Sequence, residues 1–219
     1  MKIITITDIH GHETFIESVF NMEPSADLVL ISGDITQFGG ENDARRIVEN
    51  IRKYTSKILA VSGNCDYPAT DSYLDREGIG LHGQVRHMNG IQFAGLSGSL
   101  PCPGQTPNEF TESLYARLLE QIASQISTEL PLILVTHHPP YNTLNDRVLD
   151  GRHVGCRSIR KFIDKYKPQV CVTGHIHEGC GIDTAGPTSI INSGPLFEGK
   201  YGLIRIERNI ESIEIKTFG

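Results

Sequence analysis

Five short apolar segments of this chain each end in an aspartate, an asparagine or a histidine. The polar endings are Asp8-Ile9-His10, Gly33-Asp34, Gly63-Asn64-Cys65-Asp66, His137-His138 and Gly174-His175-Ile176-His177. In open α/β sheets the carboxyl ends of the strands share one edge, and ligands bind in the crevice beside that edge. We therefore expect these residues, although they are spread from position 8 to position 177, to meet at one site.

The donor atoms of these residues suit a metal ion of intermediate softness. Carboxylate, carboxamide and imidazole groups without a thiolate favour Mn²⁺, Fe, Co, Ni or Zn²⁺ over Ca²⁺ or Mg²⁺ alone. The seven candidate ligands, more than one tetrahedral ion takes, are Asp8, His10, Asp34, Asn64, His137, His175 and His177. If Asp34 is shared, the set divides into four ligands for each of two divalent ions. Two ions about 3.5–4 Å apart could clamp a phosphoryl oxygen and turn a bridging water into a hydroxide nucleophile.

The order of these motifs resembles that of the calcineurin-like metallophosphoesterase superfamily, in particular its small prokaryotic phosphodiesterase-like members. The pattern D-x-H, G-D, G-N-x-D, H-H-P-P and G-H-x-H runs from residue 8 to residue 177, and residues 192–195 resemble the family's closing turn. The resemblance implies an α/β fold, a four-layer α/β/β/α sandwich of two mixed β-sheets flanked by helices. It implies one ion bound by Asp8, His10, Asp34 and His177, and a second bound by Asp34, Asn64, His137 and His175.

One position departs from the family pattern. Many members have a histidine after the asparagine, where it aids transition-state charge or leaving-group protonation, whereas this chain has Cys65. Because a neutral thiol is a poor proton donor, His12, His138 or His153 could take over that task. His153 is the preferred candidate because it lies in a glycine-flanked loop before a helix, while His138 either supports the site or contacts phosphate. The predicted catalytic residues are Asp34, Asn64, His138 and His153.

The elements that must position these residues are short β-branched strands and amphipathic helices. Helix-period stripes occur in residues 44–51, 110–126 and 159–166, which predicts β-α units followed by a terminal β-meander. The Pro-rich segment Leu100–Pro107 predicts a surface loop near a site. We expect a single domain over residues 1–219, with strands at Lys2–Thr7, Asp27–Ile31, Lys57–Val61, Ile91–Ala94, Leu132–Thr136, Gln169–Thr173, Ser189–Asn192, Leu203–Glu207 and Ile210–Lys216.

The composition and net charge of the chain limit the classes of molecule that it is expected to bind. The chain of 219 residues carries a formal net charge of −6, which disfavours nucleic acid and anionic membranes as partners. Bound cations could still supply local positive charge for a phosphate substrate. Five cysteines without a CxxC spacing predict neither a disulfide framework nor a thiolate zinc site. No segment reaches the ~18 apolar residues of a membrane span, so we expect a cytoplasmic protein. A homo-oligomer is compatible with the sequence.

Together these patterns predict a hydrolase of small-molecule phosphate esters with two divalent metal ions per chain, Mn²⁺ first and Fe, Ni, Co or Zn as alternatives. The resemblance favours phosphodiesters, while a monoesterase or a pyrophosphate-bond hydrolase stays open. The alternative function is a catalytically weak protein-binding scaffold of the same fold. Scaffold relatives tend to lose metal ligands, whereas all seven positions here hold competent residues. A DNA nuclease is disfavoured by the acidic charge and the absence of a capping domain.

Overall fold

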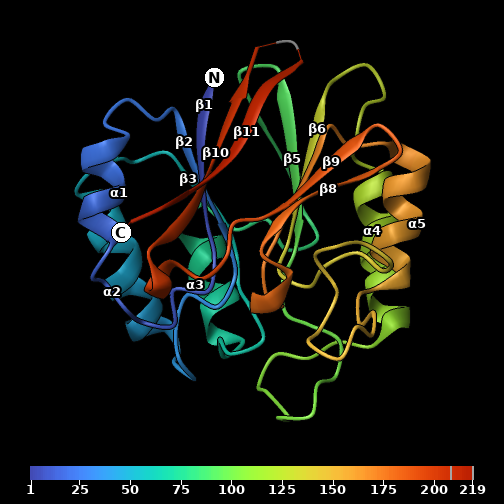
Figure 1. The fold of residues 1–219 in the computed structure, drawn as a ribbon, viewed down its shortest axis with the longest axis horizontal. Coiled ribbons are helices and arrows are strands. Elements are labelled where there is room, and N and C mark those ends of the chain that lie inside the picture. Colours follow the sequence, from blue (N-terminus) through green and yellow to red (C-terminus); the bar gives the residue numbers. More distant parts are fainter. Residues whose placement is uncertain (208, 219) are drawn as a thin grey trace.

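The computed structural model describes residues 1–207 and 209–218 and contains two mixed β-sheets packed face to face (Figure 1). The first sheet has the order β11-β10-β1-β2-β3, with bounds Ile210–Thr217, Lys200–Ile206, Lys2–Ile6, Leu28–Ser32 and Ile58–Val61. The second sheet has the order β4-β5-β6-β7-β9-β8, with bounds Val85–Met88, Ile91–Leu96, Leu132–Thr136, Val170–Thr173, Thr188–Asn192 and Gly181–Ala185.

Helices cover the outer face of each sheet, which confirms the predicted four-layer sandwich (Figure 1). The first sheet is covered by α1 (Ile16–Met22), α2 (Glu41–Arg52) and α3 (Ala69–Arg76). The second is covered by α4 (Glu112–Ala123) and α5 (Arg157–Tyr166). Among the described residues, no helix is long and apolar enough to cross a membrane.

Apolar side chains fill all three spaces between the four layers. Residues such as Leu30 and Val135 pack between the two sheets, and both are fully buried. Burying one such side chain stabilises a fold by roughly 1.5–3 kcal/mol. The outer layers are held in the same way, because the stripe containing Ile47 faces the first sheet and the stripe containing Ile159 faces the second. The sheets are therefore fixed relative to each other, which fixes the loops at their edges.

Two sequence predictions about the elements need correction. The predicted set leaves out β4 and also β8, whose residues include only two β-branched side chains, Ile182 and Thr184, and are mostly exposed or partly buried. The terminal strands also do not form one meander. The β8–β9 hairpin belongs to the second sheet and the β10–β11 hairpin to the first, and the chain crosses between the sheets through η2 (Leu196–Glu198).

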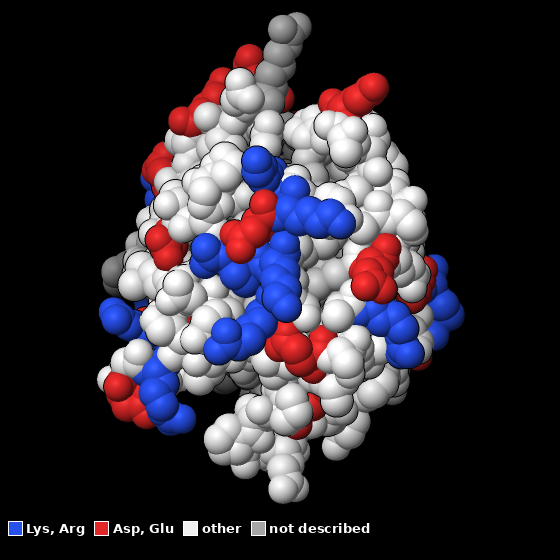
Figure 2. Space-filling view, turned by 90° about the vertical axis from the view of Figure 1, so that its right-hand side faces the viewer, with Lys and Arg blue, Asp and Glu red and all other residues white. Residues whose placement is uncertain are grey.

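The outer helical face carries positive charge. Figure 2 shows Lys and Arg side chains gathered on the face that α4 and α5 present, and α5 contributes Arg157, Arg160, Lys161 and Lys165. Some of this charge is neutralised locally, since Arg160 pairs with Asp164 at 2.9 Å. The net charge of −6 is that of the whole chain and does not describe this face.

The strands that carry the chemical motifs run parallel within their sheets. The pairs β1–β2 and β2–β3 are parallel, as are β5–β6, β6–β7 and β7–β9. Their carboxyl ends meet across the two sheets, since the Ser32 hydroxyl at the end of β2 donates to the Thr173 carbonyl at the end of β7 over 3.4 Å. The loops after these strands are thereby brought to one edge.

Candidate metal centre

The loops that follow β1, β2, β3, β6 and β7 deliver the seven predicted ligands to one edge of the sandwich. Three groups of three side chains have ligand atoms within 4.8 Å of one another. Asp8, His10 and His177 form one group, Asp8, Asp34 and His137 form the second, and His10, Asp34 and Cys65 form the third. Because the groups share Asp8, His10 and Asp34, they adjoin, and loops from both sheets converge here.

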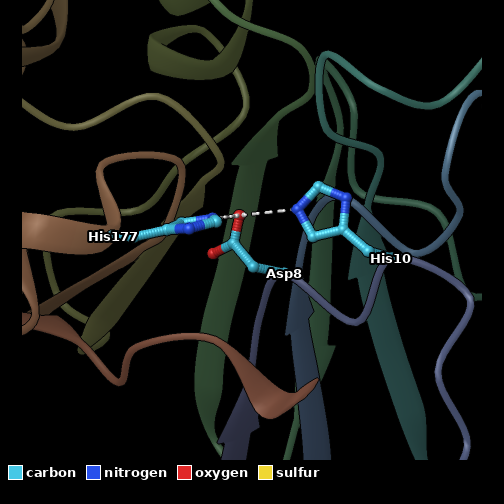
Figure 3. A group of neighbouring side chains, drawn as sticks. All are labelled: Asp8, His10 and His177. Atoms are coloured by element: carbon cyan, nitrogen blue, oxygen red, sulfur yellow. Dashed lines mark ion pairs between the residues drawn. The ribbon is translucent and has the colours of Figure 1, made fainter. Parts of the chain in front are cut away.

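The first group is centred on Asp8, whose carboxylate lies between two imidazoles (Figure 3). Its Oδ1 lies 3.3 Å from His177 Nε2 and 3.9 Å from His10 Nε2, and it has no well-aligned hydrogen-bond donor among the described residues. Its Oδ2 accepts from the Thr7 hydroxyl over 2.8 Å. Burial raises the pKa of Asp8, but its contact with His177 and the charge of His137 outweigh this, and the pKa lies below its ordinary value. A buried carboxylate oxygen without a donor, facing two imidazoles, fits a cation.

Asp34 connects the two halves of the site because its two oxygens face different histidines. Oδ2 lies 3.6 Å from His10 Nε2, and Oδ1 lies 3.4 Å from His137 Nε2. Oδ1 also accepts the Cys65 backbone N–H over 2.8 Å. Burial raises the pKa of Asp34, but the charge of His137 and a hydrogen bond with it lower the pKa to about 2. The carboxylate is therefore ionised and faces both halves.

The second half of the site contains His137, Asn64 and His175. The His137 Nδ1–H donates to the Ser32 carbonyl over 2.8 Å, so its Nε2 faces the Asn64 Oδ1 at 2.9 Å. Anchoring one ring nitrogen on a carbonyl is the usual way in which proteins orient a ligating histidine. Burial lowers the pKa of His137, but the charge of Asp34 and a hydrogen bond with it raise the pKa to about 9.

His175 lies next to His137 but outside the groups described above. Its ring centroid is 5.1 Å from that of His137, and its backbone N–H donates to Asp8 Oδ2 over 3.3 Å. Burial and the neighbouring imidazoles hold the pKa of His175 well below its ordinary value. The ring is therefore neutral and keeps a lone pair for a cation.

The backbone of the site is strained where the ligands lie. Four of the seven candidates adopt left-handed backbone: Asp8 (φ 51°), His10 (φ 48°), Asp34 (φ 47°) and His175 (φ 68°). Such conformations cost on the order of 1–3 kcal/mol each and cluster at functional sites. Close approach adds a second constraint, because a Cβ at Gly63 would lie 2.0 Å from Asp34 Oδ1. The glycine before Asn64 is therefore needed for the two loops to meet.

A hydrogen-bond chain from the Pro-rich segment orients Asn64, and no sequence pattern marks it. The Asn64 Nδ2 donates to Thr106 Oγ1 over 3.1 Å, and this hydroxyl donates to Glu109 over 2.8 Å. The Glu109 carboxylate also accepts the backbone N–H of Thr106 over 2.8 Å. With its NH₂ group held by Thr106, Asn64 presents its Oδ1 to His137 and the site.

Cys65 and Asp66 complete the G-N-x-D motif in different ways. The Cys65 thiol lies within 4.8 Å of ligand atoms of His10 and Asp34. Burial, followed by the charge of Asp34, raises the pKa of Cys65, so the thiol is neutral and a poor nucleophile.

Asp66 is a structural carboxylate to which the motif alone assigned no role. It accepts the backbone N–H of Gly63 over 2.7 Å and of Thr36 over 2.7 Å, which ties the two loops together.

His138 and His153 lie in different environments. His138 is buried, and its Nε2–H donates to the Val154 carbonyl over 3.1 Å, while its Nδ1 has no partner among the described residues. Burial lowers the pKa of His138 to about 4. His153 Nδ1 lies 2.6 Å from the buried Asp146 carboxylate, and the His153 ring packs 6.0 Å from Tyr141. The structure therefore brings His138 to the site, whereas it pairs His153 with Asp146.

An aromatic side chain covers the other flank of the centre. The Phe197 ring lies 5.6 Å from His10 and 5.7 Å from His177, and the exposed His12 lies 5.8 Å from it. Nothing in the sequence motifs identified Phe197, because it follows the closing turn by two residues and belongs to the short η2 helix. It limits solvent access to the Asp8 side of the centre.

The sequence of this chain is similar to those of known proteins. A family model described as calcineurin-like phosphoesterase matches residues 1–179. The uncharacterized protein MJ1162 of Methanocaldococcus jannaschii is 36% identical over 200 residues, which cover 89% of this chain and 88% of that protein.

Two solved structures share the fold. The protein TT1561 of Thermus thermophilus superposes with a TM-score of 0.79 at 15% identity, covering 99% of this chain and 98% of that one. A structure described as a novel archaeal phosphodiesterase gives a TM-score of 0.56 at 17% identity, with 100% of both chains covered. At these identities the similarity establishes the architecture alone.

Proposed function

The chain belongs to the calcineurin-like phosphoesterase family, and we propose that it is a metal-dependent hydrolase of small phosphodiesters. Hydrolysis adds one water across a P–O bond of the diester and releases a phosphomonoester and an alcohol. We further propose that residues 1–219 act as one metallophosphoesterase domain and that Mn²⁺ is the ion of choice.

The observation that supports this proposal best is the position of Asp34. Its two oxygens face His10 and His137 at 3.6 and 3.4 Å, so a single carboxylate can serve two cations. The orphaned Oδ1 of Asp8 and the strained ligand backbone also fit a built metal site. We assign the first ion to Asp8, His10, Asp34 and His177, and the second to Asp34, Asn64, His137 and His175.

The proposed ligands supply negative charge for the metal ions, and neighbouring groups hold the ligand atoms in position. When bound, two divalent cations would draw charge from phosphoryl oxygens and lower the pKa of water. The buried Asp8 and Asp34 carboxylates supply the negative charge that such cations require. The Ser32 carbonyl and the Thr106 hydroxyl fix the ligand atoms of His137 and Asn64 before substrate arrives. Preorganisation of this kind removes the cost of ordering ligands during reaction.

Protonation of the leaving group is the step for which the described site offers the fewest suitable side chains. The neutral thiol of Cys65 occupies the motif position of the usual histidine. We propose that His153 stabilises its loop through Asp146 instead of supplying the missing acid. His138 borders the centre, but its Nε2–H is committed to the Val154 carbonyl. The enzyme should therefore prefer esters whose alcohol departs without much protonation.

Charge near the centre favours a diester over a monoester. A monoester dianion needs more positive charge than a diester monoanion. A cavity lies beside the candidate ligands, and its wall contains the cation Arg152. This side chain is already paired with Asp150 at 2.7 Å. The same wall also carries the Glu178 carboxylate. A substrate with a single negative charge suits these surroundings better.

A metal-reconstitution assay tests the proposal. The chelated protein is supplied in turn with Mn²⁺, Ni²⁺, Co²⁺ or Zn²⁺, and nitrophenolate release is measured from bis(p-nitrophenyl) phosphate and from p-nitrophenyl phosphate. We expect metal-dependent activity that is higher on the diester, and a loss of at least about 100-fold in Asp34→Asn. Asp164→Asn is the matched control, because this exposed carboxylate pairs only with Arg160 on the outer helix layer in the described contacts.

Two results would contradict the proposal. Full activity in the chelated protein would exclude metal dependence, and equal activity of Asp34→Asn and Asp164→Asn would exclude Asp34 from the reaction. Absence of hydrolysis with every metal would instead favour the binding-scaffold alternative.

A further inference from the structure

A cavity of about 430 Å³ lies beside the candidate metal centre, and the proposed metal ligands account for only part of its wall. His138 and His175 contribute to that wall, with ring centroids 5.1 Å apart. The His175 ring lies at the same distance from His137, which faces Asp34. The volume falls within the ~300–1,000 Å³ of small-molecule pockets. A molecule in this cavity would therefore be continuous with a phosphoryl group at the centre.

Most of the cavity wall is apolar. The Pro-rich segment contributes Leu100 and Pro101, the segment of residues 148–154 contributes Val148, Leu149 and Val154, and Ile176 comes from the loop that carries the metal ligands. Neither wall segment is a helix or a strand, and of their apolar side chains Leu100 also packs against the core between the second sheet and its helices. Apolar side chains beside a charged centre are suited to an uncharged, apolar part of a ligand.

Leu149 lies at the edge of the cavity with its side chain in water. Its side chain is 88% exposed, more than any other large hydrophobic side chain described in the structure. A solvated leucine at the edge of an apolar cavity gains stabilisation when a ligand removes it from water. Because so little of Leu149 is packed against the protein, replacing it should leave the fold intact.

Both walls are held in place by buried or partly buried carboxylates. Glu109 accepts the backbone N–H groups of Thr106 and Cys102 over 2.8 and 3.3 Å in the Pro-rich segment. The fully buried Asp146 accepts the N–H groups of Asn142 and Gly155, which flank the facing segment, over 3.0 and 2.9 Å. The cavity is therefore preorganised, which lowers the ordering cost of binding.

The polar residues of the wall argue against a nucleotide or a polyphosphate. The wall contains no Phe, Tyr or Trp ring among the described residues, so the aromatic rings that it offers to a base are only the small imidazoles of His138 and His175. Its one cation, Arg152, is paired with Asp150, and Glu178 adds a further negative charge. A second anionic group would be repelled here, whereas an aliphatic group would not.

We propose that this cavity binds the aliphatic arm of the phosphodiester substrate, so that the substrates of this protein are diesters with at least one uncharged, apolar arm. This rests on the proposed function, since the phosphoryl group must lie at the metal centre for one of its arms to enter the cavity. Specificity for the arm is then set by the two irregular segments and Ile176, and not by the metal ligands.

Calorimetric binding of dialkyl phosphates tests the proposal. Dimethyl, diethyl, dibutyl and dihexyl phosphate are titrated into the Mn²⁺-loaded protein, and both arms are identical, so the orientation of the ligand does not matter. We expect the Kd to fall by up to about fourfold for each methylene buried, until the cavity is filled. Leu149→Ser should weaken dihexyl phosphate about tenfold and leave dimethyl phosphate unchanged.

Leu130→Ser is the matched control, because Leu130 is 39% exposed and precedes β6 at the sheet edge opposite to the metal ligands. This variant should bind the whole series like the wild type. A Kd independent of chain length, or a chain-length dependence that Leu149→Ser leaves intact, would overturn the proposal.

Hydrolysis of bis(p-nitrophenyl) phosphate by the same preparations separates this inference from the proposed function. Hydrolysis together with a flat Kd series would overturn the cavity assignment and keep the phosphodiesterase. A chain-length dependence sensitive to Leu149→Ser, without hydrolysis in the presence of any metal, would support the cavity and overturn the enzyme.

Discussion

Thr106→Val is a sharp test of how this site is assembled, because it removes a single contact to a candidate ligand. The Thr106 hydroxyl accepts from Asn64 Nδ2 over 3.1 Å and donates to Glu109 over 2.8 Å. Valine keeps the branched shape and removes the acceptor. Glu109 retains the backbone N–H groups of Thr106 and Cys102, so the Pro-rich segment should keep its conformation.

The magnitude follows from the loss of one neutral hydrogen bond. Such a bond contributes about 0.5–1.5 kcal/mol, which corresponds to about twofold to twelvefold in an affinity. Because Asn64 belongs to the second proposed ion only, Thr106→Val should weaken that ion by this factor and leave the first unchanged. Saturating metal should restore the kcat of the variant, since the substrate contacts and the remaining ligands are intact.

The assay is competition between the protein and a chelator for Mn²⁺, together with kcat measured against metal concentration. Thr106→Ser is the control, because serine keeps the hydroxyl and loses only a methyl group. The reasoning would be refuted if Val and Ser variants lost metal affinity equally, or if Thr106→Val bound both ions like the wild type. A kcat that stays low at saturating metal would also refute it.

Three further predictions follow from the same contacts. His137→Ala should lower metal content toward one ion per chain, whereas His138→Ala should keep the metal and alter kinetics; elemental analysis with kcat and KM distinguishes them. The wild type should show a rate that falls steeply with leaving-group pKa across aryl and alkyl esters, and Cys65→His should flatten this dependence; a flat wild-type profile would mean that another acid is present. Gly63→Ala should abolish metal binding or lower the melting temperature by several degrees, because its Cβ would lie 2.0 Å from Asp34 Oδ1; Gly40→Ala, with open space around its Cβ, should not.

Much of the fold could be predicted from the sequence because apolar runs, turn residues and helix stripes coincide with the observed elements. The run Leu132–Thr136 is β6 without a change of bounds. The strand β8 escapes prediction because only its pairing with β9 makes it a strand. The division of the last strands between two sheets depends on packing between distant segments, as in the pairing of β10 with β1, which no local pattern encodes.

For the site, residue type and order predicted which side chains meet, but not how they are held. The left-handed backbone of Asp8 and His10 is set by hydrogen bonds to the neighbouring loop, such as His10 N–H to the Asp34 carbonyl over 2.9 Å. The Thr106 contact comes from a loop without periodicity, 42 residues from Asn64. His153 looks available in the sequence because its partner Asp146 is a loop residue seven positions away, with no motif to mark the pair.

The central claim is that Asp34 is shared between two metal ions, and the metal content of Asp34→Asn tests it most directly. Wild type and variant are chelated, reloaded with Mn²⁺, freed of excess metal and measured by elemental analysis. Asparagine keeps the size of the side chain and removes the charge that both proposed ions share. We predict about two ions per chain in the wild type and substantially fewer in the variant, with both sites weakened. Two tightly held ions in Asp34→Asn would contradict the shared carboxylate.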